Sequence, residues 1–436
     1  MTGMTGIGGR RRRAGVAALL ALAVAGCGSG AVSTEPALVR VAAPGERPAP
    51  PAADLTAAAG SSNALGLDLL HTLTASGTGA ADDLAVSPSS LATALAMLAP
   101  GARGATATEL AAVLHTRLPA DRFATATGAL ARAAQSRAAA DGLTLRESAT
   151  VWLQRDYAVR EAYLDLLASA FDTGVRTADF KTDPEGARRA VNALVERQTE
   201  GYVKELFPPR AIDSRTRLAL TDTLYLKADW ASPFRKDATR QLPFHLLDGS
   251  APKVATMSRS DSLRYGAGSG WQAVELPYQG GRLALDVLLP AAGTFADFRA
   301  GLDGPLLDGI LGGLRAQAVD LALPRFAFDW GQPLVETLRT LGVRSAFGPA
   351  ADFTGIPADP KEPPLSVQSV VQKVHLAVDE QGTTAAAASG VSVRVASAAR
   401  PPGTVAEMRV DRPFLFLIRE VTTGQALFLG QVTDPR

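Results

Sequence analysis

Apolar residues recur at helical spacing through the first half of the chain. Leu65, Leu69 and Leu73 lie four positions apart, which places their side chains on one face of a helix. The same periodicity, read together with caps and helix breakers, predicts several further helices. The predicted helices are Ser61–Ser76, Leu91–Leu98 behind a Ser87–Ser90 cap, Thr106–Leu114, Arg122–Ala140, Arg160–Phe171 and Pro184–Gln198.

Strand patterns dominate the second half. Alternating positions and short apolar runs predict strands at 217–227, 283–289, 319–323, 367–378, 414–421 and 426–432, in addition to Leu145–Leu153 in the first half. One further helix, Gln332–Leu341, ends at Gly342. Helices that precede strands, instead of alternating with them, predict the α+β fold class.

The first 27 residues have the pattern of an export signal. The basic run Arg10–Arg13 precedes the apolar stretch Ala14–Ala25, about half of the roughly 20 residues that a membrane-spanning helix needs. Val24 to Cys27 resembles a bacterial lipobox, which implies cleavage of residues 1–26 and lipid attachment to Cys27. An ordinary secretory signal with a chance cysteine is the alternative.

The region after the signal is rich in Ala, Pro and Ser. This composition predicts a flexible tether over residues 27–59, followed by one folded domain over 60–436. The expected location is extracellular or in the cell envelope, with membrane contact only through the lipid on Cys27.

Charge and composition argue against several classes of function. The chain has 44 basic and 43 acidic side chains, so it lacks the positive excess that drives nucleic-acid binding. Its single cysteine excludes an internal disulfide bond. The four histidines stand in unrelated contexts without metal-ligand spacing, and no Gly-x-Ser-x-Gly elbow occurs. We therefore expect neither an enzyme nor a bound metal or other cofactor.

The segment from Asp379 to Pro402 is the most informative part of the chain. An acidic, glycine-containing start leads into the four alanines 385–388 and then into alternating Val, Ser and Arg residues. A loop of more than about 15 residues within a compact domain is usually functional or disordered. Taken alone, the segment is also compatible with a disordered alanine linker.

Ten motifs follow one another in order along nearly the whole body, from about Asn63 to Pro435. They are Leu84–Leu98 with Gly101–Gly104, Asp179–Lys181, Val191-Asn192, Thr199–Gly201, Thr216–Phe234, Val274–Tyr278, Leu288–Pro290, Ala351–Ile356, Arg412–Arg419 and Leu427–Gly430. Together they resemble the serpins, a family of serine-protease inhibitors. The resemblance implies an α+β serpin fold with about three β-sheets, eight or nine helices and an exposed reactive loop at residues 380–402.

The resemblance also implies a mechanism. The expected partner is a serine protease, which cleaves the loop of a monomeric inhibitor, forms a covalent acyl complex and is trapped when the loop inserts into the central sheet. Alternate residues of an inserting strand face inward, and the inward residues here are small and uncharged. The hinge comprises Glu380, Gly382, Thr383, Ala385, Ala386, Ala387, Ala388 and Ser389, with Thr383, Ala385, Ala387 and Ser389 inward and Gly382 supplying backbone freedom.

Family spacing places the cleaved bond sixteen residues past Glu380, between Ala396 and Ser397. Alanine before the cut favours elastase-like or subtilisin-like proteases, whose pockets accept small side chains. Arg394 is the competing choice and favours trypsin-like enzymes.

Several positions match the family's shutter beneath the central sheet. These are Ser87, Ser90 and Asn192, although helix capping and a surface amide are simpler interpretations. Gln372 stands where the family often has histidine, and Asp222 stands where it usually has asparagine. Because glutamine can both donate and accept, the hydrogen-bond network can survive the first change.

Trp230 matches the tryptophan at the entry point of the loop, called the breach, although a plain core tryptophan is the alternative. The rival function is a non-inhibitory serpin that acts as a binding or chaperone-like protein. Such members often carry charged or bulky hinge residues, so the intact hinge favours an inhibitor.

Overall fold

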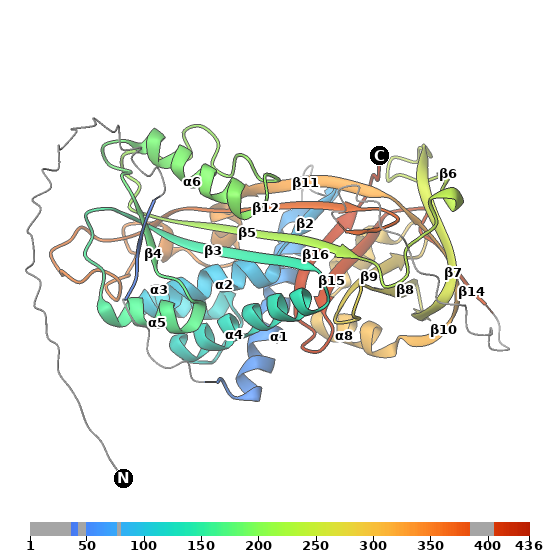
Figure 1. Cartoon of the computed structure of the whole chain (residues 1–436), viewed down its shortest axis with the longest axis horizontal. Coiled ribbons are helices and arrows are strands. Elements are labelled where there is room, and N and C mark those ends of the chain that lie inside the picture. Colours follow the sequence, from blue (N-terminus) through green and yellow to red (C-terminus); the bar gives the residue numbers. More distant parts are fainter. Residues whose placement is uncertain (1–35, 42–48, 76–79, 384–404) are drawn as a thin grey trace, which may run out of the picture. The chain divides into compact units, whose positions relative to one another are not determined.

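The computed structural model describes residues 36–41, 49–75, 80–383 and 405–436. These residues form nine α-helices and two β-sheets, so the α+β fold class is confirmed (Figure 1). No helix among them is both long enough and apolar enough to cross a bilayer.

The seven-stranded sheet has the order β1-β4-β3-β5-β13-β12-β11. Its strand β12 runs parallel to β5, whereas the short β13 lies between them at one end and is antiparallel to both. The strands are β1 Ala37–Val39, β3 Thr144–Gln154, β4 Val175–Ala178, β5 Leu218–Asp229, β11 Phe326–Pro333, β12 Val367–Val378 and β13 Gly382–Thr383.

The second sheet has the order β14-β10-β7-β8-β9-β15-β16-β2, with β6 also paired to β7. About three sheets were expected, but the long β7 pairs with β6 and β10 and then with β8, which joins two groups of strands. The strands are β2 Leu84–Val86, β6 Arg240–Pro243, β7 Lys253–Gly268, β8 Trp271–Pro277, β9 Leu283–Pro290, β10 Arg315–Pro324, β14 Ala406–Arg409, β15 Phe414–Glu420 and β16 Ala426–Val432.

Helices cover both faces of the seven-stranded sheet. Figure 1 shows α6 on one face and α2, with its neighbouring helices, on the other. Every residue of α2 is buried, because the helix packs against β3, β5 and β16 as well as α1 and α4. The helices are α1 Ala52–Thr74, α2 Pro88–Leu98, α3 Gly104–Val113, α4 Ala120–Ala140, α5 Glu161–Phe171, α6 Pro184–Gln198, α7 Phe295–Gly301, α8 Gly304–Gly313 and α9 Val335–Thr340.

Part of the predicted tether is folded, so that prediction is wrong for the described residues. Ala37–Val39 forms β1 and pairs with β4, and α1 already begins at Ala52. Ala58 and Ala59 pack in the core, and buried Asp54 forms an ion pair with Arg122 at 2.6 Å. Alanine-rich composition alone does not distinguish a tether from a helix whose small residues pack closely.

The predicted helix Gln332–Leu341 starts too early. Gln332 and Pro333 end β11, where they pair with β12, and α9 covers only Val335–Thr340. The sheet pairing overrides the helical spacing of this stretch, and only the second half of the prediction holds.

Candidate functional site

The seven-stranded sheet contains a strand position that is filled at one end only. Thr383 of β13 pairs with Ala228 of β5 and with Val378 of β12. Farther along, β5 and β12 pair directly with each other, from Leu218 with Val367 to Leu224 with Val374. Admitting a longer β13 would therefore require β5 and β12 to separate.

The hinge residues at this position are packed in the interior. Thr383 is fully buried, and its hydroxyl lies 2.5 Å from the hydroxyl of Tyr278, which belongs to the core. A Cβ atom on Gly382 would lie 1.9 Å from the carbonyl oxygen of Ala228. The φ angle of Gly382 is not positive, so the backbone freedom expected from the sequence is not the reason for glycine here. Glycine is needed because the backbone of β5 approaches so closely.

Glu380 is a buried acid held by an ion pair with the partly exposed Arg325. Its side chain is 1% exposed and accepts hydrogen bonds from Arg325, at 2.8 Å from Nε and 2.5 Å from Nη2, and from the hydroxyl of Thr239. Burial by itself raises the pKa of Glu380, but the bonds from Arg325 and Thr239 outweigh it and leave the pKa below its usual value. The loop expected to be exposed from residue 380 therefore begins in the interior, with Glu380, Gly382 and Thr383 buried and Gln381 half-buried.

Trp230 fixes the backbone on both sides of Glu380. Its indole N–H donates to the carbonyl of Asp379 at 2.9 Å, and its backbone N–H donates to the carbonyl of Gln381 at 2.8 Å. The indole also stacks on the ring of Tyr278, with centroids 4.6 Å apart. Trp230 thus does more than fill the core, because it anchors the entry to the strand position.

Beneath the paired part of β5 and β12, Gln372 joins three elements. Its Nε2 donates to Asp222 of β5 at 2.6 Å and to the carbonyl of Ser87 at 2.9 Å, while its Oε1 accepts from the Ser87 N–H at 2.9 Å. Ser87 caps α2 by accepting from the N–H and the hydroxyl of Ser90. The cap of α2 and the link between β5 and β12 therefore share one set of contacts.

Asn192 lies elsewhere, so its expected place in that cluster is wrong. It belongs to α6, on the other face of the sheet (Figure 1), where its amide bonds the backbone of Leu206 and Phe207. Both faces of the sheet carry helices, and sequence spacing did not reveal which face a helix covers. Asp222, and not Asn192, is the residue that bonds Gln372 beneath the sheet.

Around Gln372, burial favours the uncharged forms of two acidic side chains, Asp222 and Glu147. Burial raises the pKa of Asp222 to about 8, against the opposing effects of the nearby Ser90 hydroxyl and of the hydrogen bond from Gln372, and Glu147 raises it further. Burial also raises the pKa of Glu147 itself. At neutral pH, Asp222 is therefore predominantly protonated.

Several sequence-predicted site residues lie outside the described residues. They are Cys27, Ala385, Ala386, Ala387, Ala388, Ser389, Arg394, Ala396 and Ser397.

Three contacts of the site were missed by sequence reasoning. Arg325 and Thr239 hold Glu380, and Tyr278 meets Thr383, although each is at least 55 positions away along the chain. Only Tyr278 lay in a motif that had been singled out, so sequence spacing carried no signal for the other two.

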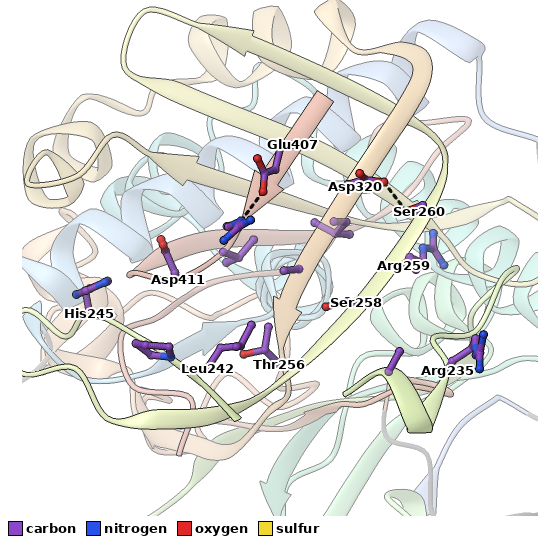
Figure 2. Close-up of a pocket in the computed structure, with 16 residues that line it drawn as sticks. Arg235, Leu242, His245, Thr256, Ser258, Arg259, Ser260, Asp320, Glu407 and Asp411 are labelled. Carbon is purple, nitrogen blue, oxygen red and sulfur yellow. Dashed lines mark hydrogen bonds and ion pairs between the residues drawn. The ribbon is translucent and has the colours of Figure 1, made fainter. Parts of the chain in front are cut away.

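A separate cavity of about 760 Å³ lies against β7, β10 and β14 (Figure 2). Its acidic side chains already have partners, since Asp320 bonds Ser260 and Glu407 pairs with Arg409. His245 lines it too, but among the described contacts its ring bonds no hydroxyl or carboxylate. This cavity shows no nucleophile–base pair, and the described residues contain no group of three side chains suited to a metal.

Comparison with known proteins identifies extensive similarity. The family model described as "Serpin (serine protease inhibitor)" matches residues 60–435. An uncharacterized serpin-like protein of Thermococcus kodakarensis is 35% identical over 352 residues, covering 80% of each chain. A serine protease inhibitor of Cyanea capillata is 31% identical, covering 82% of this chain and 93% of the relative.

Solved structures agree on the fold. Native protease nexin-1 with heparin superposes with a TM-score of 0.76 at 24% identity, covering 87% of this chain and 100% of that one. Human thyroxine-binding globulin, complexed with thyroxine, also gives a TM-score of 0.76 at 23% identity, covering 88% and 99%. At these identities the likeness establishes the fold alone.

Proposed function

Because this chain belongs to the serpin family, we propose that it inhibits serine proteases as a suicide substrate. In the proposed reaction, the protease's serine oxygen attacks the carbonyl carbon at the cleaved bond. The C–N bond breaks, the new amine leaves with a proton, and an ester joins the protease to the inhibitor. Insertion of the freed segment into the sheet then removes the ester from productive geometry before water can hydrolyse it.

The observation that carries this proposal is the position of β13. In its antiparallel register, each residue added after Thr383 would pair one residue earlier on both β5 and β12. Ala385 would then lie between Leu226 and Leu376, Ala387 between Leu224 and Val374, and Ser389 between Asp222 and Gln372. All six neighbours are buried. Small, uncharged residues suit these places, since large or charged ones would have to displace packed side chains.

The length of the sheet also supports the proposal. In the same register, Leu218 at the start of β5 would face residue 393, and Val367 of β12 would face residue 394. Insertion of residues 384–393 would therefore use the full length of β5 and carry an attached protease to the opposite end. Both candidate cleavage sites, after Arg394 and after Ala396, lie at or just beyond that end.

We propose Ala396–Ser397 as the cleaved bond, which favours an elastase-like or subtilisin-like target. The test is incubation with one protease of each class and with a trypsin-like enzyme, followed by denaturing electrophoresis and amino-terminal sequencing of the released fragment. An SDS-resistant complex of summed mass and a fragment that begins at Ser397 are expected. A fragment that begins at Val395 would assign the cut to Arg394. Cleavage without a complex in every case would contradict inhibition and favour the non-inhibitory alternative.

We propose further that the chain is exported and anchored through lipid on Cys27. Labelled fatty acid should be incorporated into the full chain produced in a bacterium with lipoprotein processing, and the Cys27→Ser variant should remain unlabelled. Equal labelling of both would contradict the anchor without affecting the inhibitory proposal.

A further inference from the structure

A carboxyl group lies directly across the line along which β5 and β12 must part. Asp222 is fully buried, and its Oδ2 accepts from Gln372, its register partner on β12. Its Oδ1 is buried too, with no hydrogen-bond partner among the described residues. A buried carboxylate normally has either a cation or several donors. With one strong donor, this carboxyl is suited to the neutral acid.

The groups around Asp222 offer no compensating positive charge. On β3, Ala149 is its register partner, and the nearby Glu147 adds a second acidic group, whose carboxyl accepts from Thr93 of α2. Lys373 follows Gln372 on β12, but successive strand residues point to opposite faces, and its Nζ donates to the carbonyl of Glu205. The remaining described neighbours are uncharged: Ser87, Ser90 and Gln372 with their polar groups, and Leu220 and Leu224 along the same face of β5.

We propose that Asp222 is a proton-controlled latch on the seven-stranded sheet: its neutral acid keeps β5 joined to β12 through Gln372, and its ionisation favours separation of the two strands. The proposal rests on the proposed function for its role, because Ser389 would enter between these two side chains. The latch would make the sheet resist insertion in acid and admit the loop more readily at neutral and mildly alkaline pH.

The sign and size of the effect follow from proton linkage. In the closed sheet the pKa of Asp222 is raised from 3.8 to about 8, and parting of the strands would let water return it toward the lower value. The closed state is therefore fully favoured below about pH 4, loses this advantage as the pH rises to about 8, and changes little above that. Complete hydration on opening would raise the opening constant by up to about 100-fold between pH 5 and pH 7.

Hydrogen–deuterium exchange of the β5 and β12 amides in the full chain tests the latch. After correction for the intrinsic pH dependence of exchange, protection in the wild type should fall from pH 5 to pH 7, by at most about 100-fold. Asp222→Asn keeps an acceptor for Gln372 but does not titrate, so its protection should fall much less over this pH range than that of the wild type. Asp165→Asn, at an exposed carboxyl on α5, is the matched control and should follow the wild type.

Constant protection in the wild type would overturn the latch, as would the same pH dependence in Asp222→Asn. If Asp222→Asn does not fold, Glu147→Gln provides the test, because it removes the neighbouring acid that raises the pKa of Asp222 and should move the midpoint of the profile to lower pH. An unmoved midpoint would count against the proposal. Exchange requires no protease, so a chain that traps no protease would contradict the proposed function while leaving this test intact.

Discussion

A pair of neighbouring loop substitutions tests the register in which the loop is proposed to insert. Ala387→Glu would place a carboxyl between Leu224 and Val374, which are 2% and 0% exposed and belong to the core. Ala388→Glu adds the same side chain one residue later, where the register puts it beside Thr223 and Lys373 on the opposite face. The two variants have the same charge and composition, so only the inserted register distinguishes them.

The size of the difference can be worked from the protonation of glutamate. A carboxyl forced into an apolar site becomes neutral, and taking it from a pKa of about 4.3 to neutrality at pH 7 costs about 4 kcal/mol. Displacement of packed side chains adds to this cost. If the carboxyl is buried before the protease is trapped, insertion slows by up to about 1,000-fold, and the acyl-enzyme has time to be hydrolysed.

The assay is the number of inhibitor molecules consumed for each protease molecule inactivated, together with the yield of SDS-resistant complex. The Ala387→Glu variant should be cleaved as a substrate with little complex. The Ala388→Glu variant should keep a complex yield near that of the wild type. Equal yields from the two variants would refute the alternation of inward and outward residues on which the inserted register depends.

Two further predictions concern the hinge. Gly382→Ala should lower the free energy of unfolding by about 1–3 kcal/mol, because its Cβ would meet the carbonyl of Ala228. The control is Gly309→Ala, whose Cβ would have open space around it. Similar melting temperatures for the two variants would contradict the close approach. Arg325→Ala leaves Glu380 buried without its cation and should cost on the order of 2–4 kcal/mol at pH 7. Since the pKa of Glu380 is lowered from 4.5 in the folded protein, this loss should shrink as the pH falls below about 4.5, and a melting-temperature difference that is the same at pH 7 and pH 4 would argue against the ion pair.

For some elements, local sequence signals predicted both boundaries correctly. The predicted helix at Pro184–Gln198 matches α6 at both ends, because Asp183 caps it and proline occupies its first turn. The strands at 367–378 and 426–432 also match β12 and β16. These elements carry their boundaries in caps and in the apolar pattern, which depend on nearby residues only.

Other features depend on distant partners and left no local signal. β13 is a strand of two residues that exists only because β5 and β12 lie on either side of it. The family resemblance drew attention to Glu380, Gly382 and Thr383 and to Ser87, Ser90 and Gln372, but it grouped Asn192 with the residues around Gln372 and did not supply Arg325 as the partner of Glu380. Which distant charges pair with each other can be predicted only when the three-dimensional arrangement is known.

The central claim is that residues after Thr383 become a strand between β5 and β12 once the loop is cut. The most direct measurement is calorimetry of the intact chain and of the same chain nicked between Val393 and Ser397. Insertion predicts a higher melting temperature for the nicked protein, since it gains paired backbone on both sides of a new strand. An unchanged or lower melting temperature after nicking would contradict the account.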